Sequence, residues 1–137
     1  MTEKQPMSLM DFVKAARARI AEVDPAELQK MMEEVDDLLL VDVREGSEHE
    51  QGHLKGAMLV PRGILEAAAD PKYPKHQPEL ASARERPLAV YCATGGRSAM
   101  AALTLQLMGF KNVVNLAGGI SRWQQEDRPV EKEARYV

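Results

Sequence analysis

Nearly uninterrupted apolar runs are the clearest pattern along this chain. A run that is continuous, rather than alternating with polar residues, is typical of a strand buried on both faces, as in a parallel sheet. The four runs lie at 38–43, 58–60, 88–91 and 113–116. The run at 58–60 is the weakest, and Pro61 ends it. A further short strand is expected at 19–23, because Ile20 and Val23 are β-branched.

Helical signals separate these runs. The expected helices cover 9–16, 25–35, 98–108 and a segment that begins after Gly118-Gly119. Ser8 precedes the first helix as its N-cap, and Asp11 three residues on makes a near relative of the capping box. Asp24-Pro25 marks the second start, since a capping residue is followed by proline in the first turn. The first helix should bury one face, made of Leu9, Phe12, Val13 and Ala16.

Strands that alternate with helices in this way indicate an α/β fold with a mainly parallel sheet. Residues 66–87 depart from the pattern, because they carry three prolines and mixed charges. We expect a long loop there, with one helical turn near 78–80. Residues 1–7 show no apolar periodicity and are interpreted as a tail.

Composition narrows the class of protein without changing this picture. The chain has 137 residues, a net charge of −3 and a pI of about 5.7. That length suits one domain, and the lack of a basic surplus argues against nucleic-acid binding. No apolar run approaches the roughly 20 residues that span a bilayer, and no secretory signal precedes the first helix. We therefore expect a cytoplasmic domain with no nucleic-acid or membrane partner.

The chain contains one cysteine, Cys92. A single thiol excludes an internal disulfide, a C-x-x-C pair and a Cys/His zinc cluster. His49 and His53 do match the H-E-x-x-H pattern of zinc proteases. However, Gly52 weakens the helix that this pattern requires by up to about 1 kcal/mol, and no clear third ligand follows. The sequence therefore predicts no metal site and no cofactor.

Cys92 directly follows the apolar run at 88–91 and precedes a short loop and a helix. It should lie at the carboxyl end of a parallel strand, where open α/β sheets place their ligands. It should also face the N–H groups that a helix N-terminus leaves unpaired. Gly95 and Gly96 would let the loop curl so that several N–H groups point at one anion. A thiolate is such an anion, so this setting favours a nucleophile over a small buried hydrophobic residue.

Four motifs, in the same order along the chain, resemble those of the rhodanese sulfurtransferases. They are Asp42-Val43-Arg44, Gly52-His53-Leu54-Lys55-Gly56-Ala57, the active-site loop Cys92-x-x-Gly95-x-Arg97-Ser98, and Gly118-Gly119-Ile120 with Trp123. The resemblance implies a three-layer α/β/α fold with a central, mainly parallel five-stranded sheet. It implies a rhodanese-like domain at 19–130, preceded by a tail and an extra helix at 1–18 and followed by a tail at 131–137.

The same resemblance implies sulfur transfer through a persulfide on Cys92. The cysteine would take sulfur from a donor, thiosulfate or a persulfide, and pass it to a thiophilic acceptor, cyanide or a thiol. Donor and acceptor would be small molecules or proteins. The N–H groups that would stabilise the charged sulfur belong to Ala93, Thr94, Gly95, Gly96, Arg97 and Ser98. The neutral side chains of Ala93 and Thr94 weigh against thiosulfate as the natural donor.

Loop length distinguishes sulfur transfer from other reactions on this fold. Cysteine phosphatases use Cys-x5-Arg, whereas four residues separate Cys92 from Arg97 here. An oxyanion reductase or phosphatase is therefore the less favoured enzyme. A non-enzymatic binding or regulatory module is a further alternative, which loss of the cysteine would have marked.

Charged residues near the loop leave some roles open. Arg97 either meets an anionic donor or, as we favour, holds the loop through an ion pair with Asp42 or Glu45. Asp42 and Arg44 end a strand on the same side of the sheet. We interpret them as support for the loop.

Overall fold

Five parallel strands form the centre of the molecule, in the order β1-β5-β4-β2-β3. The computed structural model describes residues 5–132. The strands are β1 (Ala21–Val23), β2 (Leu39–Asp42), β3 (Met58–Leu59), β4 (Pro87–Tyr91) and β5 (Asn112–Leu116). The predicted parallel sheet is confirmed. β1 begins later than expected, because Arg19 still bonds the last turn of the preceding helix and pairing with β5 starts at Ala21.

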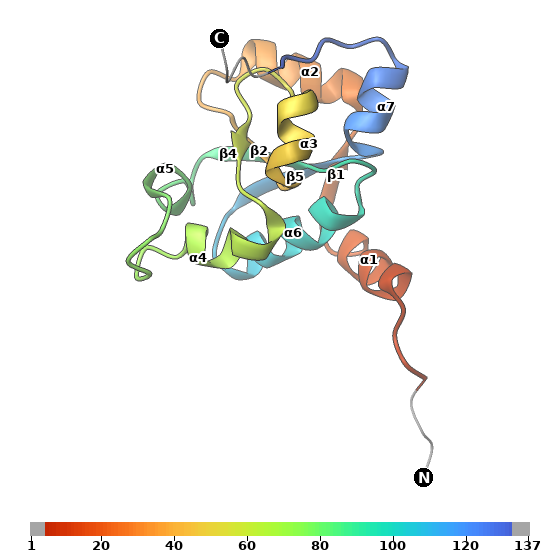
Figure 1. The fold of residues 1–137 in the computed structure, drawn as a ribbon. Helices are drawn as coiled ribbons and strands as arrows, with labels where there is room; N and C mark the ends of the chain where they lie inside the picture. The colour runs from red at the N-terminus through yellow and green to blue at the C-terminus, as the bar shows by residue number, and fades with distance from the viewer. Residues whose placement is uncertain (1–4, 133–137) are drawn as a thin grey trace.

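Helices cover both faces of this sheet, which confirms the three-layer α/β/α prediction (Figure 1). On one side lie α4 (Leu65–Ala69), α5 (Pro78–Ala81), α6 (Gly96–Leu107) and α1 (Leu9–Arg17), which packs against α6. On the other side lie α2 (Pro25–Glu34), α3 (Gly46–Gln51) and α7 (Gly119–Gln125). None of the described helices is both long enough and apolar enough to cross a bilayer.

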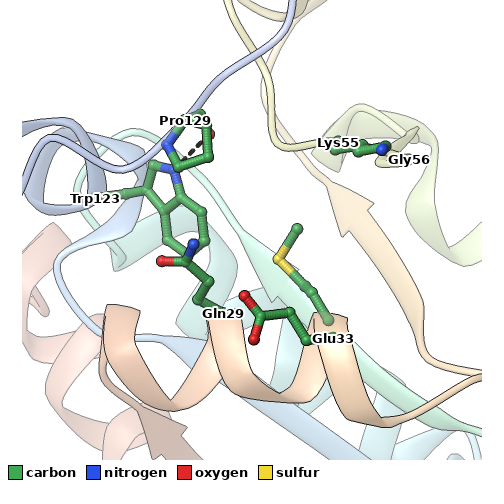
Figure 2. Close-up of a pocket in the computed structure, with 7 residues that line it drawn as sticks. Gln29, Glu33, Lys55, Gly56, Trp123 and Pro129 are labelled. Atoms are coloured by element: carbon green, nitrogen blue, oxygen red, sulfur yellow. Dashed lines mark hydrogen bonds between the residues drawn. The ribbon is translucent and has the colours of Figure 1, made fainter.

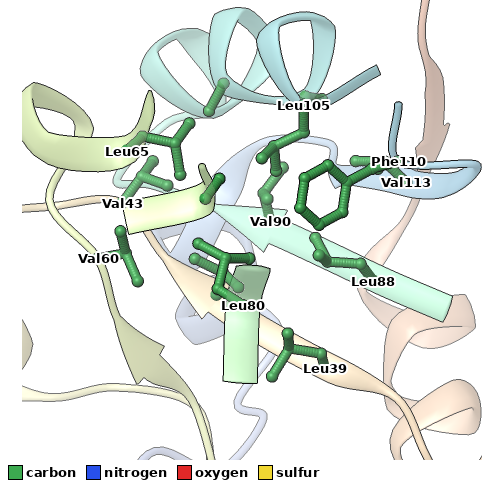
Figure 3. Close-up of a cluster of buried hydrophobic side chains, with 14 of the residues drawn as sticks. Leu39, Val43, Val60, Leu65, Leu80, Leu88, Val90, Leu105, Phe110 and Val113 are labelled. Carbon is green, nitrogen blue, oxygen red and sulfur yellow. The ribbon is translucent and has the colours of Figure 1, made fainter. Parts of the chain in front are cut away.

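The sheet divides the apolar core into two clusters, and the central strand β4 contributes side chains to both. Leu88 and Val90 point to the cluster that includes Leu105 of α6, shown in Figure 3. The alternate residues Ala89 and Tyr91 point to the opposite cluster, as the two-residue period of a strand requires. Cys92 belongs to the first cluster and therefore faces the α6 side of the sheet.

The predicted helix starts at Ser8 and Asp24 are confirmed, because both residues form complete capping boxes. The predicted apolar face of α1 is only half right. Its residues Val13 and Ala16 are buried, whereas Leu9 and Phe12 remain 67% and 51% exposed. The reason is that the first turns of α1 project beyond the body of the protein (Figure 1).

Three short helical segments were not expected from the sequence. α4 occupies the start of the loop expected at 66–87, whereas the 3₁₀ turn η1 (Arg62–Ile64) and α3 lie in segments for which no helix was predicted. These segments have three to six residues, too few to show a helical period. The single turn expected near 78–80 is present as α5.

The two predicted tails lie largely outside the described residues. Residues 5–7 have no regular secondary structure, and residues 1–4 and 133–137 lie outside the described part of the chain. Glu131, where the C-terminal tail was expected to begin, forms an antiparallel bridge with His53.

Candidate active site

Cys92 directly follows β4, and its side chain is 1% exposed. We refer to residues 92–98, which connect this strand to the first turn of α6, as the cysteine loop. The Sγ atom of Cys92 accepts hydrogen bonds from Gly95 N at 3.0 Å, Ser98 N at 3.4 Å and Ser98 Oγ at 3.2 Å. Every hydrogen bond at the sulfur therefore has the sulfur as acceptor, an arrangement that stabilises negative charge.

The loop can take this shape because Gly95 adopts a left-handed conformation, with φ of 103°. Glycine enters this region without the steric penalty of a Cβ atom. Gly95 is also the N-cap of α6, so Gly96 and Arg97 lie in the first turn, where N–H groups have no intrahelical acceptor. Of the six N–H groups expected to face the sulfur, those of Gly95 and Ser98 bond Sγ in the described structure.

The start of α7 holds the cysteine loop through hydrogen bonds to its backbone carbonyl groups. Ile120 N donates to Cys92 O and Ser121 N donates to Ala93 O, both at 2.9 Å. This close approach requires glycine at position 119, because a Cβ atom there would lie 2.5 Å from Ala93 O. The glycine pair of the C-terminal motif thus brings a second helix N-terminus against the carbonyl side of the loop.

Arg97 turns to Glu48 of α3, with both guanidinium nitrogens 2.9 Å from the two carboxylate oxygens. This ion pair agrees with the structural role favoured for Arg97, but the expected partners, Asp42 and Glu45, were wrong. α3, which the sequence pattern did not reveal, carries Glu48 to this position. The hydrogen bond from Arg97 lowers the pKa of Glu48 to about 2, and the carboxylate in turn raises the pKa of Arg97.

Asp42 and Arg44 form a buried network next to the loop. Arg44 donates to both carboxylate oxygens of Asp42, at 2.9 and 2.8 Å, and Nη2 also donates to Gly52 O at 2.7 Å. The backbone N–H of Arg44, His49 Nδ1 and Tyr91 Oη also bond the carboxylate. Asp42 and Arg44 make no hydrogen bond with the cysteine loop in the described structure. The support expected from them acts on α3 and Gly52 instead.

Within this network, the pKa of Asp42 is lowered and the pKa of Tyr91 is raised. Burial acts to raise the pKa of Asp42, but hydrogen bonds from Arg44 and His49 outweigh it and hold that pKa below its ordinary value. Burial and the nearby Asp42 carboxylate raise the pKa of Tyr91. The network is therefore a carboxylate that stays charged beside a phenol that stays protonated.

The two histidines of the H-E-x-x-H pattern are arranged as packing residues. Their rings stack with centroids 3.9 Å apart and planes 8° from parallel. His49 Nδ1 bonds the Asp42 carboxylate, and His53 Nδ1 bonds His49 O, so each Nδ1 carries the proton. Within residues 5–132, no group of three or more His, Cys, Asp or Glu side chains is placed to hold a metal ion.

The sequence analysis missed Glu48 and Asn115, which both contact the cysteine loop. Glu48 gave no signal, because it lies in a short polar segment. Asn115 did give one, since it is a polar residue inside the apolar run at 113–116. Its side chain is fully buried and donates to Gly95 O at 3.2 Å.

A cavity of about 470 Å³ lies elsewhere, on the face that α2 and α7 cover (Figure 2). Its lining residues are Gln29, Met32, Glu33, Lys55, Gly56, Trp123 and Pro129. The indole of Trp123 is held by a hydrogen bond from Nε1 to Pro129 O at 2.8 Å. None of the lining residues belongs to the cysteine loop, so this cavity is separate from the candidate site.

The sequence model of the rhodanese-like domain matches residues 24–126, so the chain belongs to the rhodanese-like domain family. This finding confirms the family resemblance and the fold class expected from the four motifs. Sulfurtransferases are among its relatives. One of them, a sulfurtransferase of Allochromatium vinosum, is 30% identical over 111 residues, which are 81% of this chain and 94% of that protein.

Two solved structures extend the comparison over more of the chain. A protein of unknown function from Rhodopseudomonas palustris, described as a possible tyrosine phosphatase, has a TM-score of 0.86 at 30% identity. The match covers 96% of this chain and 99% of that one. The polysulfide-sulfur transferase homodimer of Wolinella succinogenes has a TM-score of 0.69 at 32% identity, over 90% of this chain and 87% of that one.

Proposed function

We propose that this protein transfers sulfane sulfur through a persulfide on Cys92. The observation that carries the proposal is the environment of Sγ, which accepts hydrogen bonds from two N–H groups and one hydroxyl at the N-terminus of α6. These donors suit a thiolate, and equally a persulfide anion extending from it. Sulfurtransferase relatives at about 30% identity support the same reaction class.

The reaction needs two displacements and no cofactor. In the first, the Cys92 thiolate attacks the outer sulfur of the donor, a new S–S bond forms, and the donor's old bond to that sulfur breaks. The bonding electron pair leaves with the donor remnant, which is sulfite from thiosulfate or a thiolate from a persulfide. In the second, the acceptor attacks the outer sulfur and Cys92 leaves as the thiolate. Covalent catalysis of this kind gives ping-pong kinetics.

The donor we favour is a persulfide or polysulfide rather than thiosulfate. Thiosulfate is a dianion and would gain from a cation at the mouth of the loop. Ala93 and Thr94 are neutral, and the guanidinium of Arg97 is already engaged by Glu48. A neutral or singly charged donor loses less by the lack of such a cation.

Phosphate-ester hydrolysis is the second candidate, since the relative from Rhodopseudomonas palustris is described as a possible tyrosine phosphatase. A cysteine phosphatase needs an arginine that binds the phosphate oxygens beside the nucleophile. Here the loop to Arg97 is one residue shorter than Cys-x5-Arg, and that arginine binds Glu48. Both features favour sulfur transfer.

The test is to load the purified protein with an organic persulfide, remove the excess and measure the intact mass. We expect one added sulfur atom on the peptide that contains Cys92, its removal by cyanide as thiocyanate, and faster loading by the persulfide than by thiosulfate. An aryl phosphate assayed in parallel should give no turnover. No added sulfur with any donor, or appreciable phosphate release, would overturn the proposal.

A further inference from the structure

Asn115 connects the cysteine loop to β1, the strand at one edge of the sheet. Its Nδ2 atom donates to Gly95 O at 3.2 Å and to Glu22 Oε2 of β1 at 2.9 Å. Glu22 Oε2 in turn lies 3.4 Å from Arg17 Nε of α1. We refer to Arg17, Glu22 and Asn115 as the positioning network, because they form a continuous polar path from the N-terminal helix to the loop.

The register of the sheet explains why these residues meet. β5 pairs Asn115 with Glu22 of β1 on one side and with Val90 of β4 on the other. Cys92 follows Val90 by two residues, so its side chain leaves β4 on the same face of the sheet. The network and the nucleophile therefore share the face that α6 covers.

The hydrogen bonds of the Asn115 amide identify its contribution. Both N–H positions are used, whereas Oδ1 is buried and has no hydrogen-bond partner among the described residues. A buried acceptor without a partner lowers stability, and the neighbours of Asn115 in β5 are apolar. An apolar residue would avoid that loss, so what asparagine adds here is its donation to Glu22 and Gly95.

Gly95 makes the shortest of the three hydrogen bonds that the sulfur accepts. Its N–H donates to Cys92 Sγ at 3.0 Å, while its carbonyl accepts from Ala99 N at 3.0 Å and from Asn115. A glycine has more backbone freedom than any other residue, so a second bond on its carbonyl restricts where its N–H points.

α1 reinforces the same residues from outside. The Nη2 atom of Arg17 lies 3.4 Å from the position that a Cβ atom on Gly95 would take. The side chain of Val13 lies at the same distance from the corresponding position on Gly96. The helix that precedes the family-matched residues thus packs directly on the glycine pair of the cysteine loop.

We propose that Asn115 is a positioning residue for Cys92, and that Glu22 and Arg17 hold it in place. By fixing the Gly95 carbonyl, Asn115 aligns the Gly95 N–H with the sulfur and so favours the thiolate and the persulfide anion. The inference rests on the proposed role of Cys92 as the sulfur-carrying nucleophile. It also gives α1 a function in the site.

The experiment measures alkylation of Cys92 by iodoacetamide as a function of pH, which reports on one site because the chain has one cysteine. In Asn115→Leu, the pH midpoint of alkylation should rise and the rate at pH 7 should fall about fivefold, the effect of one typical hydrogen bond. Glu22→Leu should give a smaller shift in the same direction. Glu22→Gln, which keeps an acceptor for Asn115, should give a smaller shift than Glu22→Leu.

The matched control is Val113→Ala, since Val113 is buried in the same strand and on the same face. It should lower stability without moving the alkylation midpoint. An unchanged midpoint in Asn115→Leu, or an equal shift in Val113→Ala, would overturn the inference. If Asn115→Leu does not fold, the comparison of Glu22→Leu with Glu22→Gln decides it in the same way.

The alkylation profile requires no sulfur donor. A shifted midpoint in a protein that fails to accept sulfur would therefore retain the positioning role and reject the proposed function. Normal sulfur loading with an unshifted midpoint would retain the proposed function and reject the positioning role.

Discussion

The carboxyl ends of the neighbouring strands β2 and β4 lie side by side, yet they carry opposite kinds of polar site. Asp42 ends β2 and pairs with Tyr91 of β4 in the register, one residue before Cys92. The Asp42 carboxylate bonds one backbone N–H and several side chains, among them the cation of Arg44. The Cys92 sulfur is surrounded by donors of its own loop, two N–H groups and one hydroxyl.

This difference separates a site that stabilises the fold from the site at which we propose a reaction. The charge of Asp42 is matched by Arg44, so the network is electrically satisfied and holds α3 and Gly52 in place. At Cys92 the nearest arginine in sequence, Arg97, is held by Glu48. The donors that face the sulfur are dipoles rather than a bonded cation, an arrangement that suits the proposed reaction because it leaves the sulfur able to form a new bond.

The largest expected effect is the loss of sulfur transfer in Cys92→Ser. A serine hydroxyl does not ionise near neutral pH, so the donors of the loop would have no anion to stabilise. Thiocyanate formation should fall to the level of a blank without protein. The free energy of unfolding in urea should change by less than about 1 kcal/mol, because the two side chains are nearly isosteric. Turnover retained in this variant would contradict the assignment of the nucleophile.

Asp42→Asn should have the largest effect on stability. It leaves the guanidinium of Arg44 buried without its counter-charge, a change that costs about 3 kcal/mol or more. Urea denaturation measures this loss, and the folded protein should still be alkylated at Cys92 at nearly the original rate. Glu85→Gln, which removes an exposed partner of Lys111, is the control and should be neutral. An equal response of the two variants would remove the contrast between the strand ends.

Gly119→Ala should lower both the stability of the fold and the reactivity of Cys92. The new Cβ atom would lie 2.5 Å from Ala93 O, and the residue would have to keep a φ of 62°. We expect a loss of about 2 kcal/mol in unfolding free energy and slower alkylation of Cys92, because the loop must move. Gly63→Ala is the matched control, since no atom lies within 4 Å of the Cβ position there. Equal effects of the two substitutions would show that α7 does not fix the loop.

The smallest effect concerns the pair of Glu48 and Arg97 and depends on pH. Arg97 lowers the pKa of Glu48 from 4.5 to about 2 in the folded protein. The pair therefore adds stability above about pH 4.5, and this contribution is lost as the pH falls toward 2. Since a third of the Glu48 side chain is exposed, the contribution should stay below about 1 kcal/mol.

Urea denaturation of the wild type and of Glu48→Gln across this pH range measures the contribution. The difference in unfolding free energy should be constant above pH 5 and shrink below it. A difference that grows on acidification would have the wrong sign for a carboxylate with a lowered pKa.

The strands and long helices could be predicted because each is encoded by neighbouring residues. The apolar runs became β2, β4 and β5, and the caps at Ser8 and Asp24 began α1 and α2 as expected. α3 and α4 could not be predicted from periodicity, because six and five residues complete fewer than two turns. The exposure of Leu9 and Phe12 depended on how far the body of the protein extends along α1, which the α1 sequence does not contain.

The candidate site divides in the same way. The strand, the glycine pair and the length of the loop at Cys92 are all local, so the chemistry of that loop could be argued from the sequence. The partners of the loop are distant. Arg97 lies 49 residues from Glu48, and Asn115 lies 93 residues from Glu22. No pattern along the chain joins such pairs.

The sequence by itself determined the α/β class, the family resemblance, the position of the single cysteine and a loop with four residues between Cys92 and Arg97. Only the tertiary structure decided that Arg97 binds Glu48, that the two histidines stack, and that α1 and β1 reach the loop through Asn115. The physical reason is the range of the interactions. Backbone conformation and strand burial follow from residues a few positions apart, whereas hydrogen bonds between side chains require the strand order and register that only the assembled sheet provides.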